Sequence, residues 1–120
     1  SIMFFIASFA TMVSMNINAQ NTYKISLAGQ TTDTLSRQEI TANPVVAVVG
    51  IADSVTFFEL TYMNTHGDLI VVPSGSNQMT ERMLEIISTP AVKKIFIENA
   101  AFSMNGKTIK ASTKKFFLKD

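Results

Sequence analysis

The residues best suited to nucleophilic chemistry are Ser74 and Ser76, which flank Gly75 in the stretch VVPSGSNQMTERMLEII. A serine between a strand and a helix is the setting of a nucleophile elbow, but the G-x-S-x-G pattern fails because no second glycine flanks either serine. A serine hydrolase also needs a general base, and His66 is the only histidine in the chain. A small exported hydrolase using Ser74 or Ser76 with His66 is therefore an alternative, and the failed motif favours a non-enzymatic protein.

Metal and cofactor sites are not indicated by the other polar residues. His66 lies in NTHGD with Asp68 two positions away, which falls short of the ligand set of a zinc site. Asp33, Asp53 and Asp68 lie in separate turns and lack the spacing of a calcium loop. The five glycines are isolated, so no phosphate-binding loop is present, and the chain has no cysteine. We predict no metal, no cofactor and no small-molecule substrate.

Half of the ten Lys and Arg residues lie between positions 107 and 119, close to Phe116 and Phe117. Lysines along a terminal strand protect a sheet edge from pairing, and this is the favoured interpretation. These C-terminal lysines, Lys107, Lys110, Lys114, Lys115 and Lys119, could instead bind an acidic partner or an acidic envelope glycan. Basic residues among aromatics also bind single-stranded nucleic acid, but the net charge is only +1 and the chain is predicted to be exported, so we predict no nucleic-acid partner.

The elements that must position these residues are mostly strands. Ser36 and Glu39 fit a capping box that begins a short helix, and Pro44 ends it. Thr80 is placed to cap a second helix over residues 81–87. Alternating or β-branched apolar residues predict strands over residues 22–27, 45–49, 55–63, 69–72 and 92–102, with one or two more in 108–119.

Turn signals connect these strands. NTHGD predicts a hairpin between residues 55 and 72, and Asn105-Gly106 predicts another near the C-terminus. Residues 28–36 are expected to form a turn. In the strand 55–63, the alternation selects Phe58, Leu60 and Tyr62 for the core. The layout predicts one all-β sandwich or barrel-like domain with short helices.

Residues 1–20, SIMFFIASFATMVSMNINAQ, carry no charge and end in a cleavage-like Ala19. The apolar core is shorter than the roughly 20 residues of a membrane-spanning helix, so it is interpreted as a signal peptide. Residues 1–19 are the expected leader and residues 20–120 the single exported domain, periplasmic or at the cell surface. Membrane attachment is expected only if the leader is retained.

Several stretches resemble the C-terminal periplasmic domain of the GldM/PorM family, components of gliding motility and type IX secretion in Bacteroidetes. They are LSRQEITANPVVAVV, VTFFELTY, SGSNQMTERMLEII and KKIFIENAAFSMNGKTIKASTKKFFLK. The resemblance implies an immunoglobulin-like β-sandwich that binds envelope proteins, or a second copy of itself, and carries no catalytic residues. Ser74, Ser76, Asn77, Lys114 and Lys115 are the predicted partner-binding residues. The chain lacks the family's motor helix and preceding domains, so torque transmission is not expected.

Overall fold

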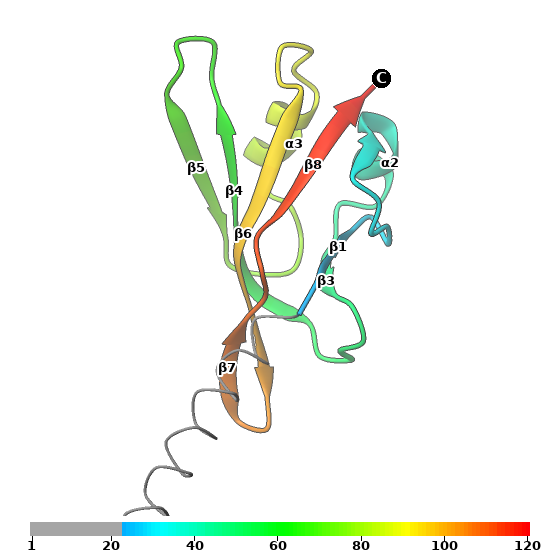
Figure 1. The fold of residues 1–120 in the computed structure, drawn as a ribbon, viewed down its shortest axis with the longest axis vertical. Helices are drawn as coiled ribbons and strands as arrows, with labels where there is room; N and C mark the ends of the chain where they lie inside the picture. The colour runs from blue at the N-terminus through cyan, green and yellow to red at the C-terminus, as the bar shows by residue number, and fades with distance from the viewer. Residues whose placement is uncertain (1–22) are drawn as a thin grey trace, which may run out of the picture.

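The computed structural model describes residues 23–120, and the predicted leader, residues 1–19, lies outside them. Eight strands and two helices follow one another along these residues (Figure 1). In chain order they are β1 (Ile25–Leu27), β2 (Thr34–Ser36), α2 (Arg37–Ala42), β3 (Val46–Val48), β4 (Val55–Met63), β5 (Leu69–Ser74), α3 (Glu81–Ile87), β6 (Lys94–Met104), β7 (Lys107–Lys110) and β8 (Lys114–Lys119). The predicted mainly β fold with two short helices is confirmed.

Six of the strands form one sheet in the order β2-β8-β6-β4-β5, and β7 pairs with the far end of β6. All pairs in this sheet are antiparallel except β2 with β8, which run parallel. The long strand β6 is its spine, because it pairs with β4, β7 and β8. The remaining strands, β1 and β3, form a separate antiparallel pair.

The two sheets pack around one core. Its buried side chains include Ile25 and Val46 from the small sheet and Phe58 and Phe116 from the large sheet. The helices complete the layer that the two-stranded sheet only partly fills, through Ile40 of α2 and through Met83, Ile86 and Ile87 of α3. The result is sandwich-like, with a large sheet on one side and a mixed layer of two strands and two helices on the other.

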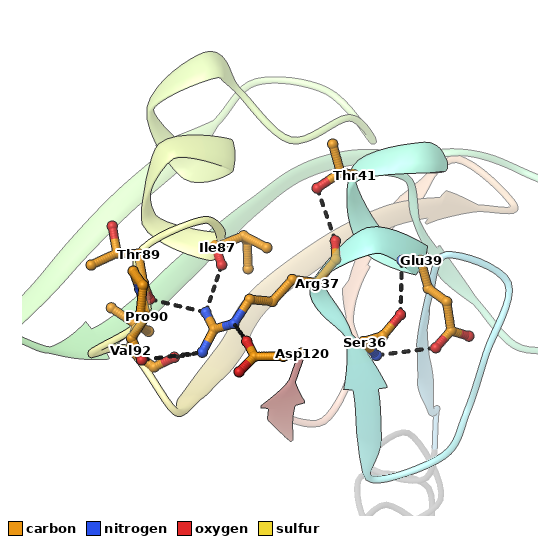
Figure 2. Close-up of polar contacts among 9 residues, drawn as sticks. All are labelled: Ser36, Arg37, Glu39, Thr41, Ile87, Thr89, Pro90, Val92 and Asp120. Atoms are coloured by element: carbon orange, nitrogen blue, oxygen red, sulfur yellow. Dashed lines mark hydrogen bonds and ion pairs between the residues drawn. The ribbon is translucent and has the colours of Figure 1, made fainter.

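Both helices begin where the sequence predicts. The amide of Glu39 donates to Ser36 Oγ at 3.0 Å and the amide of Ser36 donates to Glu39 Oε1 at 3.1 Å, which is the expected capping box (Figure 2). Thr80 Oγ1 accepts from the amide of Met83 at 3.2 Å and caps α3 in the same way. Short polar side chains thus satisfy backbone donors that a helix leaves free.

Arg37, the first residue of α2, joins the two helices. Its guanidinium reaches the segment that follows α3 and donates to the carbonyls of Ile87 and Val92 at 2.7 Å, Thr89 at 3.0 Å and Pro90 at 3.4 Å (Figure 2). Its Nε pairs with Asp120 Oδ1 at 3.0 Å. An arginine side chain has five N–H donors, and the five hydrogen bonds of Arg37 use all of them. Nothing in the local sequence around Arg37 predicts this role.

The C-terminal hairpin also forms as predicted. Asn105 and Gly106 have φ values of 53° and 77°, so both occupy the left-handed region that a two-residue hairpin turn requires. Residues 28–36, in contrast, are not entirely a turn, since Thr34–Ser36 pairs with β8 as β2. So short a strand leaves almost no periodic signal, and it forms because β8 offers a partner.

The position of β8 corrects part of the edge-protection interpretation of the C-terminal lysines. The strand lies between β6 and β2, but β2 pairs only with residues 117–119, so Lys114 and Lys115 lie on a part of β8 that pairs with β6 alone. Of those lysines, Lys107 and Lys110 lie on β7, which pairs only with β6. Of the remaining three, on β8, only Lys119 lies opposite β2.

Candidate interaction surface

Ser74 and His66 are not brought together. Ser74 pairs with Phe58 at one end of the β4–β5 hairpin, whereas His66 lies in the turn at the other end. The five residue steps from Leu69 to Ser74 alone span about 16 Å in a strand. Ser74 is 3% exposed, and its hydroxyl donates to the Gln78 carbonyl at 2.7 Å. Within residues 23–120, Ser74 and His66 therefore do not form a hydrogen-bonded pair.

Hydrogen bonds hold the loop that contains three predicted partner-binding residues, Ser74, Ser76 and Asn77. Ser76 Oγ accepts from the amide of Gln78 at 3.1 Å, and the Asn77 carbonyl accepts from the amide of Val46 at 2.8 Å. Ser74 is buried, Ser76 is exposed and Asn77 is half-buried. Ser74 therefore orders the loop, and binding of a partner by Ser76 and Asn77 stays a prediction.

Lys114 and Lys115 point to opposite faces of the large sheet, as neighbouring residues in a strand must. The Lys114 ammonium lies 2.6 Å from Asp33 Oδ1, and this hydrogen bond, together with the charge of Lys114, lowers the pKa of Asp33. Lys115 instead places its ammonium 4.9 Å from the ring centroid of Phe117. The two lysines belong to two different surfaces.

One face of the large sheet points away from the core. Neither the helices nor the small sheet covers this face. Alternation along the strands assigns its residues, because Phe58, Leu60, Ile95, Ile97, Phe116 and Leu118 are buried in the core and their neighbours point the other way. We call this surface the open face. Its residues are Glu59, Thr61 and Met63 of β4; Leu69, Val71 and Pro73 of β5; Lys94, Phe96 and Glu98 of β6; and Lys115, Phe117 and Lys119 of β8.

The open face gathers most of the exposed apolar side chains. Among residues 23–120, five large hydrophobic residues are classed as exposed, and four of them lie here: Met63 at 55%, Leu69 at 63%, Val71 at 51% and Phe117 at 42%. Single exposed hydrophobic residues are ordinary, whereas a contiguous group marks a contact surface. The concentration on one face is therefore the informative observation.

The strand register makes this group contiguous. Val71, Thr61, Phe96 and Lys115 are successive cross-strand partners and form one row. In the next row Leu69 pairs with Met63, and Lys94 pairs with Phe117. Between these rows lies a hollow of about 310 Å³, lined by Thr61, Met63, Leu69, Lys94, Phe96 and Glu98. Apolar side chains thus line a shallow depression rather than a deep cavity.

Charged side chains lie within and beside these rows, since Lys115 belongs to the first row and Lys94 to the second. Lys94, Lys115 and Lys119 lie toward β6 and β8, whereas Glu59 and Glu98 face each other across β4 and β6. The carboxylates are held in place: Asn99 Nδ2 donates to Glu59 Oε1 at 2.6 Å, and Thr61 Oγ1 donates to Glu98 Oε1. The open face thus combines exposed apolar side chains with charged ones, a mixture that is common in protein interfaces.

Sequence reasoning missed most of this surface. It identified Phe58, Leu60 and Tyr62 as the core side of β4 but assigned no role to the opposite side. The available signal was that strands 55–63 and 69–74 carry apolar residues on both faces, which exceeds what one buried face requires. Of the five predicted partner-binding residues, only Lys115 lies on the open face.

Within residues 23–120, no group of three or more His, Asp and Glu side chains is arranged to hold a metal ion. None of the helices between Tyr23 and Asp120 is long and apolar enough to cross a membrane. No protein-family model matches the chain, and no significant match is found among curated proteins.

Proposed function

We propose that this protein is a non-enzymatic interaction module of the bacterial envelope, and that its open face binds another envelope protein. The observation that carries the proposal is the grouping of Met63, Leu69, Val71 and Phe117 on the uncovered face. Water contact with so much apolar surface is unfavourable, at roughly 25 cal/mol per Å², so a partner that covers it gains affinity. The uncharged leader of residues 1–19 and the resemblance to the GldM/PorM domain support an envelope location.

The charges of the open face favour a partner with a particular chemistry. Lys94, Lys115 and Lys119 lie among and beside the apolar side chains on the side of β6 and β8. A partner surface with an apolar centre and acidic residues on the matching side would complement them. A second copy of this chain is the competing occupant, and the experiment below distinguishes the two.

The proposal is tested with the tagged full chain, captured with cross-linking from an envelope extract. Leu69→Lys and Val71→Lys place a charge among the apolar side chains, and Ala47→Lys is the control because Ala47 is an exposed strand residue outside the open face. We expect one partner to be recovered with the wild type and with Ala47→Lys, and to be reduced about tenfold or more by the other two changes.

Two outcomes contradict the proposal. Equal recovery by all four proteins shows that the open face is not the contact, and no recovery with the wild type shows that no partner is bound. Sedimentation analysis of the same proteins tests the competing occupant. A dimer that Leu69→Lys and Val71→Lys dissociate assigns the face to a second copy instead.

A further inference from the structure

A second surface, on the other side of β8, has a different chemistry. A hollow of about 480 Å³ lies between the chain entering β1, the loop ahead of β2 and the start of β8. It is lined by Lys24, Ile25, Thr31, Val49, Ser112, Thr113 and Lys114. This volume is larger than that of the hollow on the open face and falls within the usual range for small-molecule sites. The surface contains Lys114 but none of the twelve residues of the open face.

The charge of this hollow suits an anion with a single negative charge. Two of its lining side chains, Lys24 and Lys114, are positive, and no acidic side chain lines it. The nearby Asp33 carboxylate, 2.6 Å from the Lys114 ammonium, offsets much of that second charge. Roughly one positive charge is therefore left for a ligand, which matches a carboxylate better than a doubly charged phosphate.

The lining also contains groups that could bind a ligand with several hydroxyl groups. The hydroxyls of Thr31 and Thr113 form no hydrogen bond within residues 23–120, and a hydroxyl both donates and accepts. Val49, 49% exposed, gives the hollow an apolar side chain. Hydroxyl groups beside an apolar patch fit the alternating O–H groups and C–H face of a sugar ring.

We propose that this hollow binds an acidic sugar, with the carboxylate at Lys24 and Lys114 and the ring hydroxyls at Thr31 and Thr113. Asp33 pairs with Lys114 and limits how strongly the charge of Lys114 attracts the ligand. The site operates independently of the open face, because the side chains of β8 alternate between the two surfaces.

The test is a titration of the isotope-labelled full chain with D-glucuronate, in which NMR measures the amide chemical shifts. We expect saturable shifts at the amides of Thr31 and Thr113 and none with neutral D-glucose. Lys24→Gln and Lys114→Gln should each weaken binding about tenfold, the effect of losing one charge-assisted hydrogen bond. Lys119→Gln removes the same charge from the open face and should leave the affinity unchanged.

Asp33→Asn gives the most discriminating result. It frees Lys114 from its carboxylate partner, so we expect glucuronate to bind several-fold more tightly. Absence of saturable shifts, equal shifts with glucose, or equal weakening by Lys24→Gln and Lys119→Gln overturns the proposal. Weaker binding by Asp33→Asn overturns the role given to Asp33. If Lys114→Gln unfolds, Lys24→Gln and Asp33→Asn still decide the outcome. None of these results bears on binding of a protein by the open face.

Discussion

The two faces of the large sheet are built from the same strands and similar residue types, yet the elements of residues 23–120 cover only one of them. On the covered face, Phe116 is fully buried among residues of the small sheet and the helices. On the open face, its neighbour Phe117 is 42% exposed and lies beside lysines. Apolar residues on one face hold the fold together, and those on the other are available to a partner. Residue type alone therefore does not separate stability from binding in this protein.

The sharpest test of this comparison uses those adjacent phenylalanines. Phe116→Ala should lower the free energy of unfolding by about 3–5 kcal/mol, because it removes a buried ring and leaves a cavity. Phe117→Ala should cost less than about 1 kcal/mol, because the ring is already partly in water. Urea denaturation of both variants measures the difference. Similar losses from the two changes would mean that the faces are not distinct.

A second test removes polar contacts on the covered side of the sheet and leaves the apolar core residues unchanged. Arg37→Ala removes the guanidinium that joins α2 to the four carbonyls after α3 (Figure 2). We expect a loss on the order of 3 kcal/mol, since two or more half-buried carbonyls lose a charged donor. Arg82→Ala, which removes an exposed ion pair with Glu85, is the control and should cost less than about 0.5 kcal/mol. Equal losses would refute the joining role.

A third test concerns the loop between β5 and α3. Ser74→Ala removes the hydroxyl that donates to the Gln78 carbonyl, and we expect a loss of about 1 kcal/mol in unfolding free energy. Ser76→Ala changes an exposed hydroxyl in the same loop and should cost only a few tenths of a kcal/mol. The reverse order would show that Ser74 does not order this loop.

The smallest expected effect is a pH dependence at the start of α2. Hydrogen bonds from the backbone and side chain of Ser36 lower the pKa of Glu39 below its ordinary 4.5. The carboxylate therefore contributes stability above that value, and the contribution is lost as the pH falls through the lowered pKa. Glu39→Gln keeps the capping box but does not titrate, so unfolding free energy should fall less steeply with acid than in the wild type. Unfolding curves collected from neutral pH to about pH 3 measure both slopes, and identical slopes would contradict the prediction.

Much of the secondary structure was predictable, since its signals are local. The capping box of Ser36 and Glu39, the Thr80 cap and the Asn105-Gly106 turn each involve residues within a few positions of one another. The core side of β4 was also predictable in part, with Phe58 and Leu60 buried and Tyr62 partly so. Val55 is buried too, although alternation assigns it to the opposite side. Register shifts between Val55 and Glu59 explain this, since a bulge changes which way the following residues point.

The candidate surfaces were predictable only in fragments. Lys114 and Lys115 were selected together by their charge, but they lie on different surfaces. The residues of the open face come from four strands between Glu59 and Lys119, and no spacing in the sequence links them. Their contact follows from strand pairing over long sequence separations, for which short-range periodicity carries no information.

By itself, the sequence determined a mainly β chain with two capped helices, because these features depend on local hydrogen bonds and alternation. The tertiary structure alone decided that β8 lies inside the sheet and that Arg37 binds the carbonyls after α3. It also decided which apolar face stays uncovered. The reason is physical: alternation gives a strand two faces, but which face is buried depends on where the helices and the second sheet pack.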